Sequence, residues 1–244
     1  PRSSRRLLLA RVVSSTLLYG AQIWADALQL QENTRRMQSV YRLTALRVIS
    51  AFRTVSYEAA CVVAGMKPIN IVADEAKRLF DGKKEGMGRE DRKREEDASM
   101  RAWQERWDAA DKGRWTHRLI PNVEVWTNRK HGEVNYHLTQ FLTGHGCYRK
   151  YLHRFGHDDS PFCPVCVDEE EDVEHVMFKC QRFQEERDEL CKATSMAIGP
   201  DSIVTEMLKS QEVWNAVCSV VKKVNEALRA IEKARRSRNI SEQQ

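Results

Sequence analysis

The sequence predicts a mainly α fold, with a helical bundle followed by a small cysteine-histidine knuckle that has helices on either side. Three observations lead to this fold class. Apolar residues in the first third of the chain recur at helical spacing, with almost no strand-like alternation. Three cysteines and one histidine gather in CPVCVDEEEDVEHVMFKC at 163–180. The segments around that stretch have helix-forming composition.

Residues 1–80 predict several helices packed as a small bundle. RRLLLARVVSSTLLYGAQIWADAL, at 5–28, is apolar on most of its circumference and is expected to form one buried helix. A second helix follows from the spacing of apolar residues over 37–48. A third is expected to begin after Ser56, a good N-cap, and to end at Gly65. Pro68 suits the first turn of a fourth.

Residues 81–112 predict a charged linker or an exposed helix start. DGKKEGMGREDRKREEDASM has no apolar face before its last residue. Trp103 and Trp107 stand four apart and predict a helix face that returns to a core. With Trp115 and Trp126 they could be stacking platforms for bases, but packing anchors are the favoured interpretation.

Residues 113–190 are expected to form the knuckle region. Two short helices are predicted ahead of the cysteines, one ended by Gly144 and the other by Gly156. The second, CYRKYLHRFG, has one apolar face at helical spacing, formed by Tyr148, Tyr151, Leu152 and Phe155. Its basic residues fall elsewhere, so it can meet nucleic acid or be an ordinary amphipathic helix.

The cysteines and histidine predict a structural zinc site. The pattern C-x2-C-x8-H-x4-C supplies three sulfurs and one imidazole, a donor set and spacing that suit tetrahedral Zn²⁺, from Cys163, Cys166, His175 and Cys180. Four protein ligands leave no position for water or substrate, so the metal is expected to brace the fold. The helix-forming composition after residue 173 predicts that His175, Cys180 and Arg187 share one helix. Cys61, Cys191 and Cys218 are interpreted as small buried apolar residues.

The loop between Cys166 and His175 carries six acidic residues and would repel phosphate. If this module binds nucleic acid, it must therefore use another surface. The candidate contact residues are the basic side chains on either side of the loop, namely Arg149, Lys150, Arg154, Lys179 and Arg182.

Residues 191–244 are expected to form a C-terminal helical basic tail. The net charge of the whole chain is +5, and the first 60 residues hold nine arginines against three acids. Such basic ends can follow a phosphate backbone, or they can be solvated helix faces, and charge alone leaves both open. The longest early stretch without charge, 12–25, is shorter than the roughly 20 residues of a membrane span, so no membrane segment is expected.

The stretches FLTGHGCYRKYLHRFG, CPVC and EHVMFKC resemble the C-terminal segment of the Pol-like proteins of arthropod type-1 non-LTR retrotransposons, which insert into ribosomal RNA genes, and of their telomeric-repeat relatives. LLLARVVSSTLLYGAQIWADAL resembles the helical region after the polymerase palm of the same proteins. The resemblance covers nearly the whole chain, and the cysteine-histidine part is the more specific. It implies that residues 1–80 are thumb-like, and that Cys163, Cys166, His175 and Cys180 are the metal ligands of the family's CCHC motif.

In that family the full protein has an endonuclease, a reverse transcriptase and the cysteine-histidine motif, and it primes cDNA synthesis on nicked target DNA. Its polymerase needs paired aspartates that hold Mg²⁺. The only adjacent aspartates here, Asp158 and Asp159, lack the aromatic context of that turn, so we expect no catalysis from this segment.

The resemblance therefore implies a piece of a longer polyprotein that binds RNA or DNA. It also implies that the protein acts in the nucleus during integration, with the remainder of its own polyprotein as a partner and no membrane. The alternative is a zinc-braced module for protein-protein contacts that does not touch nucleic acid. An independent metalloenzyme is disfavoured by the saturated ligand set.

Overall fold

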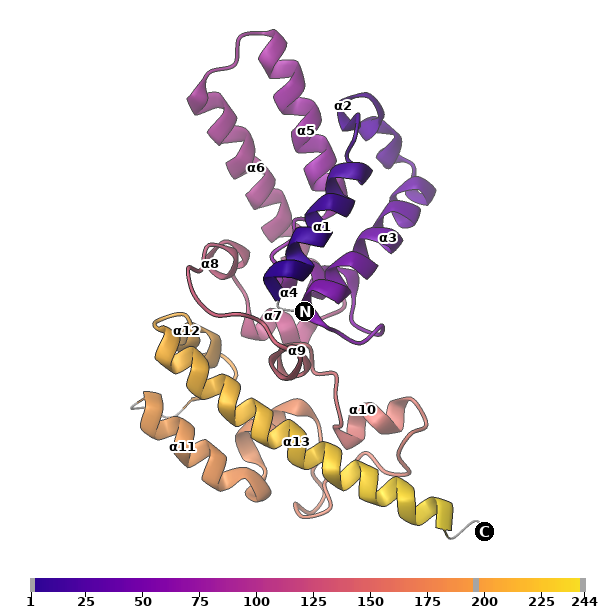
Figure 1. The fold of residues 1–244 in the computed structure, drawn as a ribbon, viewed down its shortest axis with the longest axis vertical. Helices are drawn as coiled ribbons and strands as arrows, with labels where there is room; N and C mark the ends of the chain where they lie inside the picture. Colours follow the sequence, from indigo (N-terminus) through magenta and orange to yellow (C-terminus); the bar gives the residue numbers. More distant parts are fainter. Residues whose placement is uncertain (1–2, 195–197, 242–244) are drawn as a thin grey trace. The chain divides into compact units, whose positions relative to one another are not determined.

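The computed structural model describes residues 3–194 and 198–241, and within these ranges the chain is helical and has no β-strand. The chain divides into two compact units. Unit 1 comprises the described residues up to Arg129 together with Glu133–Asn135. Unit 2 comprises Lys130–Gly132 together with the described residues from Tyr136 onward. The predicted mainly α fold is confirmed (Figure 1).

The single buried helix expected at 5–28 is wrong. The chain forms α1 (Ser3–Leu17), then α2 (Ala21–Trp24) and the 3-10 helix η1 (Ala25–Gln29), with a break at Gly20, whose φ of 68° is left-handed. α1 packs on α3 (Gln31–Ile49), but only a narrow stripe of it is covered. Leu8 is 62% exposed and Leu9 65% exposed. A helix that is apolar all round therefore presents an uncovered apolar face in unit 1.

The third helix begins and ends where the sequence predicts, and the fourth begins next to the predicted proline but continues to Lys84. α4 spans Tyr57–Ala64, and the Ser56 side chain accepts a hydrogen bond from the Ala59 amide as its N-cap. Gly65 ends it with φ of 64°, a left-handed conformation that glycine adopts without strain. α5 (Ile69–Lys84) starts directly after Pro68. These boundaries depend on local capping chemistry, which explains why the sequence alone predicts them.

The segment expected to be a linker is largely helix. α6 (Arg89–Asp108) packs against α5 and against α8 (Val123–Thr127), with α7 (Arg114–Leu119) between α6 and α8 in the chain. Trp103, Trp107 and Trp126 are fully buried in unit 1, so packing is confirmed as their role. Trp115 is only half-buried. The boundaries of the four expected segments therefore differ from those of the two units. Residues 113–129 belong to unit 1, whereas the cysteines at 163–180 belong to unit 2.

No single helix among the described residues is both long and apolar enough to cross a membrane. The segments Ser4–Leu17 and Ala21–Gln29 together reach the length and apolar composition of a membrane span, but the chain bends by 52° between them.

Unit 2 is organised around one long helix, α13 (Gln211–Ser241). α9 (Tyr136–Thr143), α11 (Gln184–Thr194) and α12 (Ile203–Met207) pack on it (Figure 1). Its buried side chains recur at helical spacing: Trp214, Val217, Val221, Val224 and Leu228. The expected basic tail is therefore also a core helix, and the cysteine-histidine segment lies in the same unit, after α10 (Arg149–Arg154).

Candidate metal centre

The four residues predicted as metal ligands come together in unit 2. One ligand atom from each of Cys163, Cys166, His175 and Cys180 lies within 4.8 Å of all the others. The Cys180 sulfur is 3.8 Å from that of Cys163 and 4.0 Å from that of Cys166. A tetrahedral ion with metal–sulfur bonds of about 2.3 Å places its sulfurs about 3.8 Å apart. The sulfurs therefore have the separation that a shared metal ion requires.

A tight loop presents the first two cysteines. The Cys163 amide donates to the Glu169 carbonyl at 2.7 Å, and Phe162 pairs with Glu170 in an isolated antiparallel bridge. Between them Asp168 has φ of 57°, a left-handed conformation that Asp tolerates better than most side chains. The Cys166 amide donates to the Cys163 sulfur at 3.4 Å. The backbone thus holds both thiols on one side of the turn.

The other two ligands do not share one helix with Arg187, contrary to the expectation. His175 begins a short π-helical turn, η2 (His175–Lys179), in which the Cys180 amide donates to the His175 carbonyl at 2.7 Å. Cys180 itself is extended, and α11 starts only after the 3-10 turn η3 (Gln181–Phe183). The wide turn and the extended residue allow both side chains to reach the same point, which a continuous α-helix with a spacing of five residues would not.

The histidine has the surroundings of a metal ligand. The His175 side chain is buried, and neither ring nitrogen has a hydrogen-bond partner among the described residues. An unpaired buried nitrogen is costly unless something binds it. Burial lowers the pKa of His175 below its ordinary value of 6.5, although Glu169 and Asp172 oppose that shift. The ring is therefore neutral at pH 7, the form that can bind a metal.

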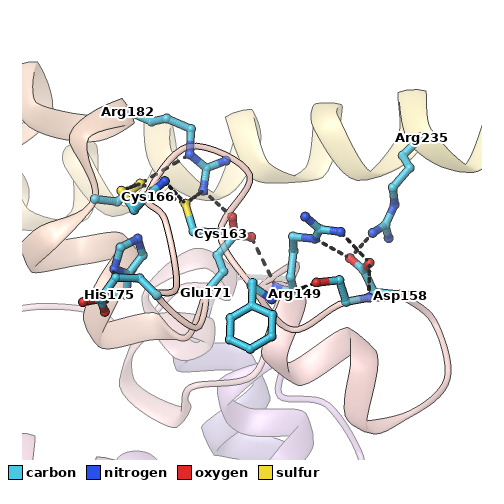
Figure 2. Close-up of polar contacts among 12 residues, drawn as sticks. Arg149, Asp158, Cys163, Cys166, Glu171, His175, Arg182 and Arg235 are labelled. Atoms are coloured by element: carbon cyan, nitrogen blue, oxygen red, sulfur yellow. Dashed lines mark hydrogen bonds and ion pairs between the residues drawn. The ribbon is translucent and has the colours of Figure 1, made fainter.

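The Arg182 guanidinium contacts the sulfurs of Cys180 and Cys163. Its Nε is 3.3 Å from the Cys180 sulfur, and one of its terminal nitrogens is 3.5 Å from the Cys163 sulfur (Figure 2). Burial opposes ionisation of Cys163, but the amides of Cys166 and Val165 together with Arg182 outweigh it and lower the pKa of that thiol. The guanidinium therefore stabilises negative charge on the ligands, a role that the sequence did not suggest for a candidate nucleic-acid contact.

Glu171 completes the support of Arg182. Its side chain is 2% exposed and forms an ion pair with the Arg182 guanidinium. It also accepts a hydrogen bond from the Arg149 amide at 3.3 Å. Burial raises the pKa of Glu171, whereas Arg182 lowers it. One acid of the loop that was expected to repel phosphate is thus an internal partner of a basic residue.

A second buried carboxylate ties α10 to α13. Asp158, with a side chain that is 1% exposed, accepts two hydrogen bonds of 3.1 Å from the Arg149 guanidinium. Arg235 of α13 forms an ion pair with the same carboxylate, and Figure 2 shows both arginines converging on it. Asp158 therefore belongs to a structural ion-pair cluster with Arg149 and Arg235, and its lack of a catalytic role stays a prediction.

The remaining candidate contact residues have different surroundings. Lys150 is 2.6 Å from Glu170 and 3.5 Å from Asp172, measured to the carboxylate oxygens. Lys179 pairs with Glu174 at 3.2 Å. Arg154 is exposed and its guanidinium lies 5.7 Å from the centre of the Phe155 ring. Of the five candidates, Arg149 and Arg182 are held inside unit 2, while the other three are at its surface. Contact with nucleic acid stays a prediction for all five.

Sequence reasoning missed Glu171 and Arg235 as supports of this region. The only available signal was the acidity of the loop and the basicity of the C-terminal helix, which predicted their charge but not their partners.

Curated proteins with similar sequences come from one kind of genetic element. The chain is 30% identical over 205 residues to the putative 115 kDa protein in type-1 retrotransposable element R1DM of Drosophila melanogaster, a match that covers 77% of this chain and 20% of that protein. It is 25% identical to the retrovirus-related Pol polyprotein from type-1 retrotransposable element R1 2 of Nasonia vitripennis, over 98% of this chain and 61% of the relative. A Pol polyprotein from element R1 of Bradysia coprophila is 27% identical over 77% of this chain and 20% of the relative.

The chain thus spans between about a fifth and about three fifths of the length of these relatives. No protein-family model and no solved structure matches it.

Proposed function

Because this chain is homologous to the Pol polyproteins of arthropod type-1 non-LTR retrotransposable elements, we propose that it serves such a polyprotein as a zinc-braced nucleic-acid-binding segment. Its ligand would be the element RNA or the target DNA during target-primed reverse transcription. The observation that carries the proposal is that one ligand atom from each of four residues lies close to all the others, in a chain similar to retrotransposon Pol polyproteins. These residues are Cys163, Cys166, His175 and Cys180.

Zinc is the metal that this donor set favours. Three thiolates and one neutral imidazole suit a tetrahedral zinc ion, while hard cations such as Mg²⁺ prefer oxygen ligands. When bound, the ion would supply folding free energy rather than a reactive water, since its four positions are all taken by the chain. The metal would then hold the loop at 163–171 against η2, in addition to the ion pair between Glu171 and Arg182.

The nucleic-acid part of the proposal depends on surface charge. Lys150 is half-exposed and Arg154 is exposed, both on α10, next to the loop that the metal braces. The acids nearest to Lys150 are already paired with it, so the loop repels phosphate less than its composition suggests. An approaching phosphate backbone can exchange these exposed ion pairs at little cost, because such pairs are individually weak.

The test is binding of the zinc-loaded chain to labelled RNA and DNA at several salt concentrations. Changing Lys150 and Arg154 together to Ala should weaken binding and reduce the slope of log K against log salt by about 1.5 to 2. Arg149 is left unchanged in this design because it holds Asp158. Lys192→Ala, at an exposed lysine of α11, is the matched control and should leave the slope nearly unaltered. A wild-type chain that binds neither RNA nor DNA at low salt would refute the proposal.

One observation favours the alternative role in protein-protein contacts. α1 leaves Leu8, Leu9 and Val12 exposed on unit 1, and an exposed apolar face of this kind is typical of an interaction site. Most of the Drosophila relative lies outside the matched segment and can supply a partner surface. The test is whether this chain binds that remaining part of the relative, and whether Leu8→Gln with Val12→Gln abolishes the binding.

A further inference from the structure

Three aromatic rings form a connected row on unit 2. The ring centres of His145 and Tyr151 are 5.1 Å apart, and those of Tyr151 and Phe155 are 5.0 Å apart. The planes are inclined at 66° and 57°, so the rings meet at their edges and do not cover one another face to face. Phe155 is 41% exposed, and Tyr151 and His145 are half-buried. We name His145, Tyr151 and Phe155 the aromatic row.

The row differs from the apolar face that the sequence predicts for α10. Tyr148 and Leu152 are buried in the unit, as a packing face requires. Phe155 is 41% exposed and Tyr151 is only half-buried, although their spacing puts them in the same predicted face. The core therefore covers only part of that face and leaves the Phe155 ring at the surface.

Local contacts orient the His145 ring and fix the backbone at Phe155. His145 lies between Gly144, whose φ is 67°, and Gly146, where a Cβ would come within 2.8 Å of the Gln140 side chain and 3.0 Å of the Tyr148 ring. The His145 Nδ1 donates to the Thr143 carbonyl at 2.6 Å, which orients the imidazole. Phe155 ends α10, with its amide donating to the Leu152 carbonyl at 3.1 Å. The His145 ring is thus oriented without a ligand, so little of its conformational entropy would be lost on binding.

We propose that the aromatic row is a stacking platform for unpaired nucleobases, so that this segment binds single-stranded RNA or DNA in preference to a duplex. The inference depends on the nucleic-acid-binding function proposed above and names the form of its ligand. Every base has a π-face that can stack on an exposed aromatic ring, whereas the bases of a duplex already stack on one another.

The charges beside the row suit the backbone of such a strand. Arg154 is exposed and adjoins Phe155, with 5.7 Å between its guanidinium and the ring centre. Lys150 is one position before Tyr151 and half-exposed. Surfaces that bind single strands combine cations with aromatic rings. The cations contact the phosphates and the rings stack on the bases. Apolar protein partners would gain nothing from these two charges.

The experiment measures binding of the zinc-loaded chain to oligouridylate and to oligothymidylate of about a dozen nucleotides, a length that covers a single-strand site. The same measurements use a double-stranded form of each strand. We expect tighter binding to the single strands. Phe155→Leu should weaken that binding at least about fivefold, the lower end of what one stacked base contributes. The salt slope should not change, because no ionic contact is lost.

Two variants distinguish stacking from a structural effect. Phe155→Tyr keeps a ring and should retain nearly wild-type binding. Tyr136→Leu removes a partly exposed ring at the start of α9, whereas His145 follows the end of that helix, and this variant should bind like the wild type. All variants should keep their zinc content and helical signal, since none of these side chains is among the four metal-site residues.

The outcomes separate this inference from the proposed function. If the wild type binds nucleic acid but prefers the duplex, or if Phe155→Leu binds single strands normally, the aromatic row is not a stacking platform, while the proposed function stands. If the wild type binds no nucleic acid at all, both are refuted. Comparison of the uridylate and thymidylate strands tells whether RNA or DNA is the preferred source of the bases.

Discussion

Arg182 lies behind Cys180 with 3.3 Å between its Nε and the cysteine sulfur, and the same guanidinium reaches Cys163 and the buried carboxylate of Glu171. A positive charge beside two thiolates offsets part of the negative charge that three sulfurs bring to one metal ion. Such an outer partner orients the ligands and tunes their affinity without binding the metal. The relationship leads to predictions about the metal, about Arg182 itself, about pH and about the neighbouring ion pairs.

The purified chain is expected to contain about one zinc ion, and Cys180→Ser should lose most of it. Without the metal, the loop at 163–171 is joined to η2 and η3 only by side-chain contacts such as the Glu171–Arg182 ion pair and the 3.8 Å contact of Glu169 with His175, so unit 2 should lose protection from proteolysis around 160–185. Unit 1 has a core of its own and should keep its protection. Metal analysis with limited proteolysis checks this, and Cys218→Ser is the control for loss of a thiol outside the site. Equal protection with and without metal would end the structural-zinc proposal.

Arg182→Gln should lower the affinity for zinc by about 10- to 100-fold, the usual effect of removing an outer partner of a metal ligand. Two changes cause this: the thiolates lose a stabilising charge, and Glu171 is left buried without its cation. Competition with a chelator of known affinity measures the change. Lys192→Ala, at an exposed lysine of α11 outside the four metal-site residues, is the matched control and should leave zinc affinity unchanged. Equal affinities for wild type and Arg182→Gln would show that the guanidinium has no part in binding.

Acidification should release the metal, because protons compete with it for the ligands. Burial lowers the pKa of His175 below 6.5, so the ring accepts a proton only at a pH below its ordinary range. Metal content should therefore stay level from about pH 8 to about 6.5 and decline below that. In Arg182→Gln the decline should begin at higher pH, because the pKa of Cys163 is no longer lowered by the guanidinium. A titration that follows bound zinc checks both curves, and coincident curves would contradict the second expectation.

Asp158→Asn should destabilise unit 2 by about 3 kcal/mol, since it leaves two arginines facing a site without a charge to pair them. Part of the loss should appear as weaker protection of α13 near Arg235, which Asp158 joins to α10. Denaturant unfolding of the zinc-loaded protein with hydrogen exchange measures both effects. The neighbouring Asp159 is exposed, so Asp159→Asn should change neither. Equal stability of the two variants would show that the ion-pair cluster is only a surface contact.

Several features follow from the sequence because they depend on nearby residues. Ser56 and Gly65 bound α4 through their own capping and left-handed conformation, as the sequence predicts. The four candidate ligands are confirmed as a cluster because all of them fall between 163 and 180, where one turn and one short helical segment bring them together. The break at Gly20 and the exposed face of α1 were not predicted, because an apolar pattern does not tell how much of a helix finds a partner.

The sequence by itself determined the helical class, the capped helices of unit 1 and the identity of the candidate ligands. Only the tertiary structure decided what the charges do. Arg149, Arg182 and Arg235 read as basic residues available for phosphate, yet each is paired with a carboxylate or a sulfur inside unit 2. Composition records the sign of a charge, whereas its partner depends on which distant segments pack together. Arg235 meets Asp158 only because α13 packs across unit 2, and packing of that kind cannot be read from local sequence.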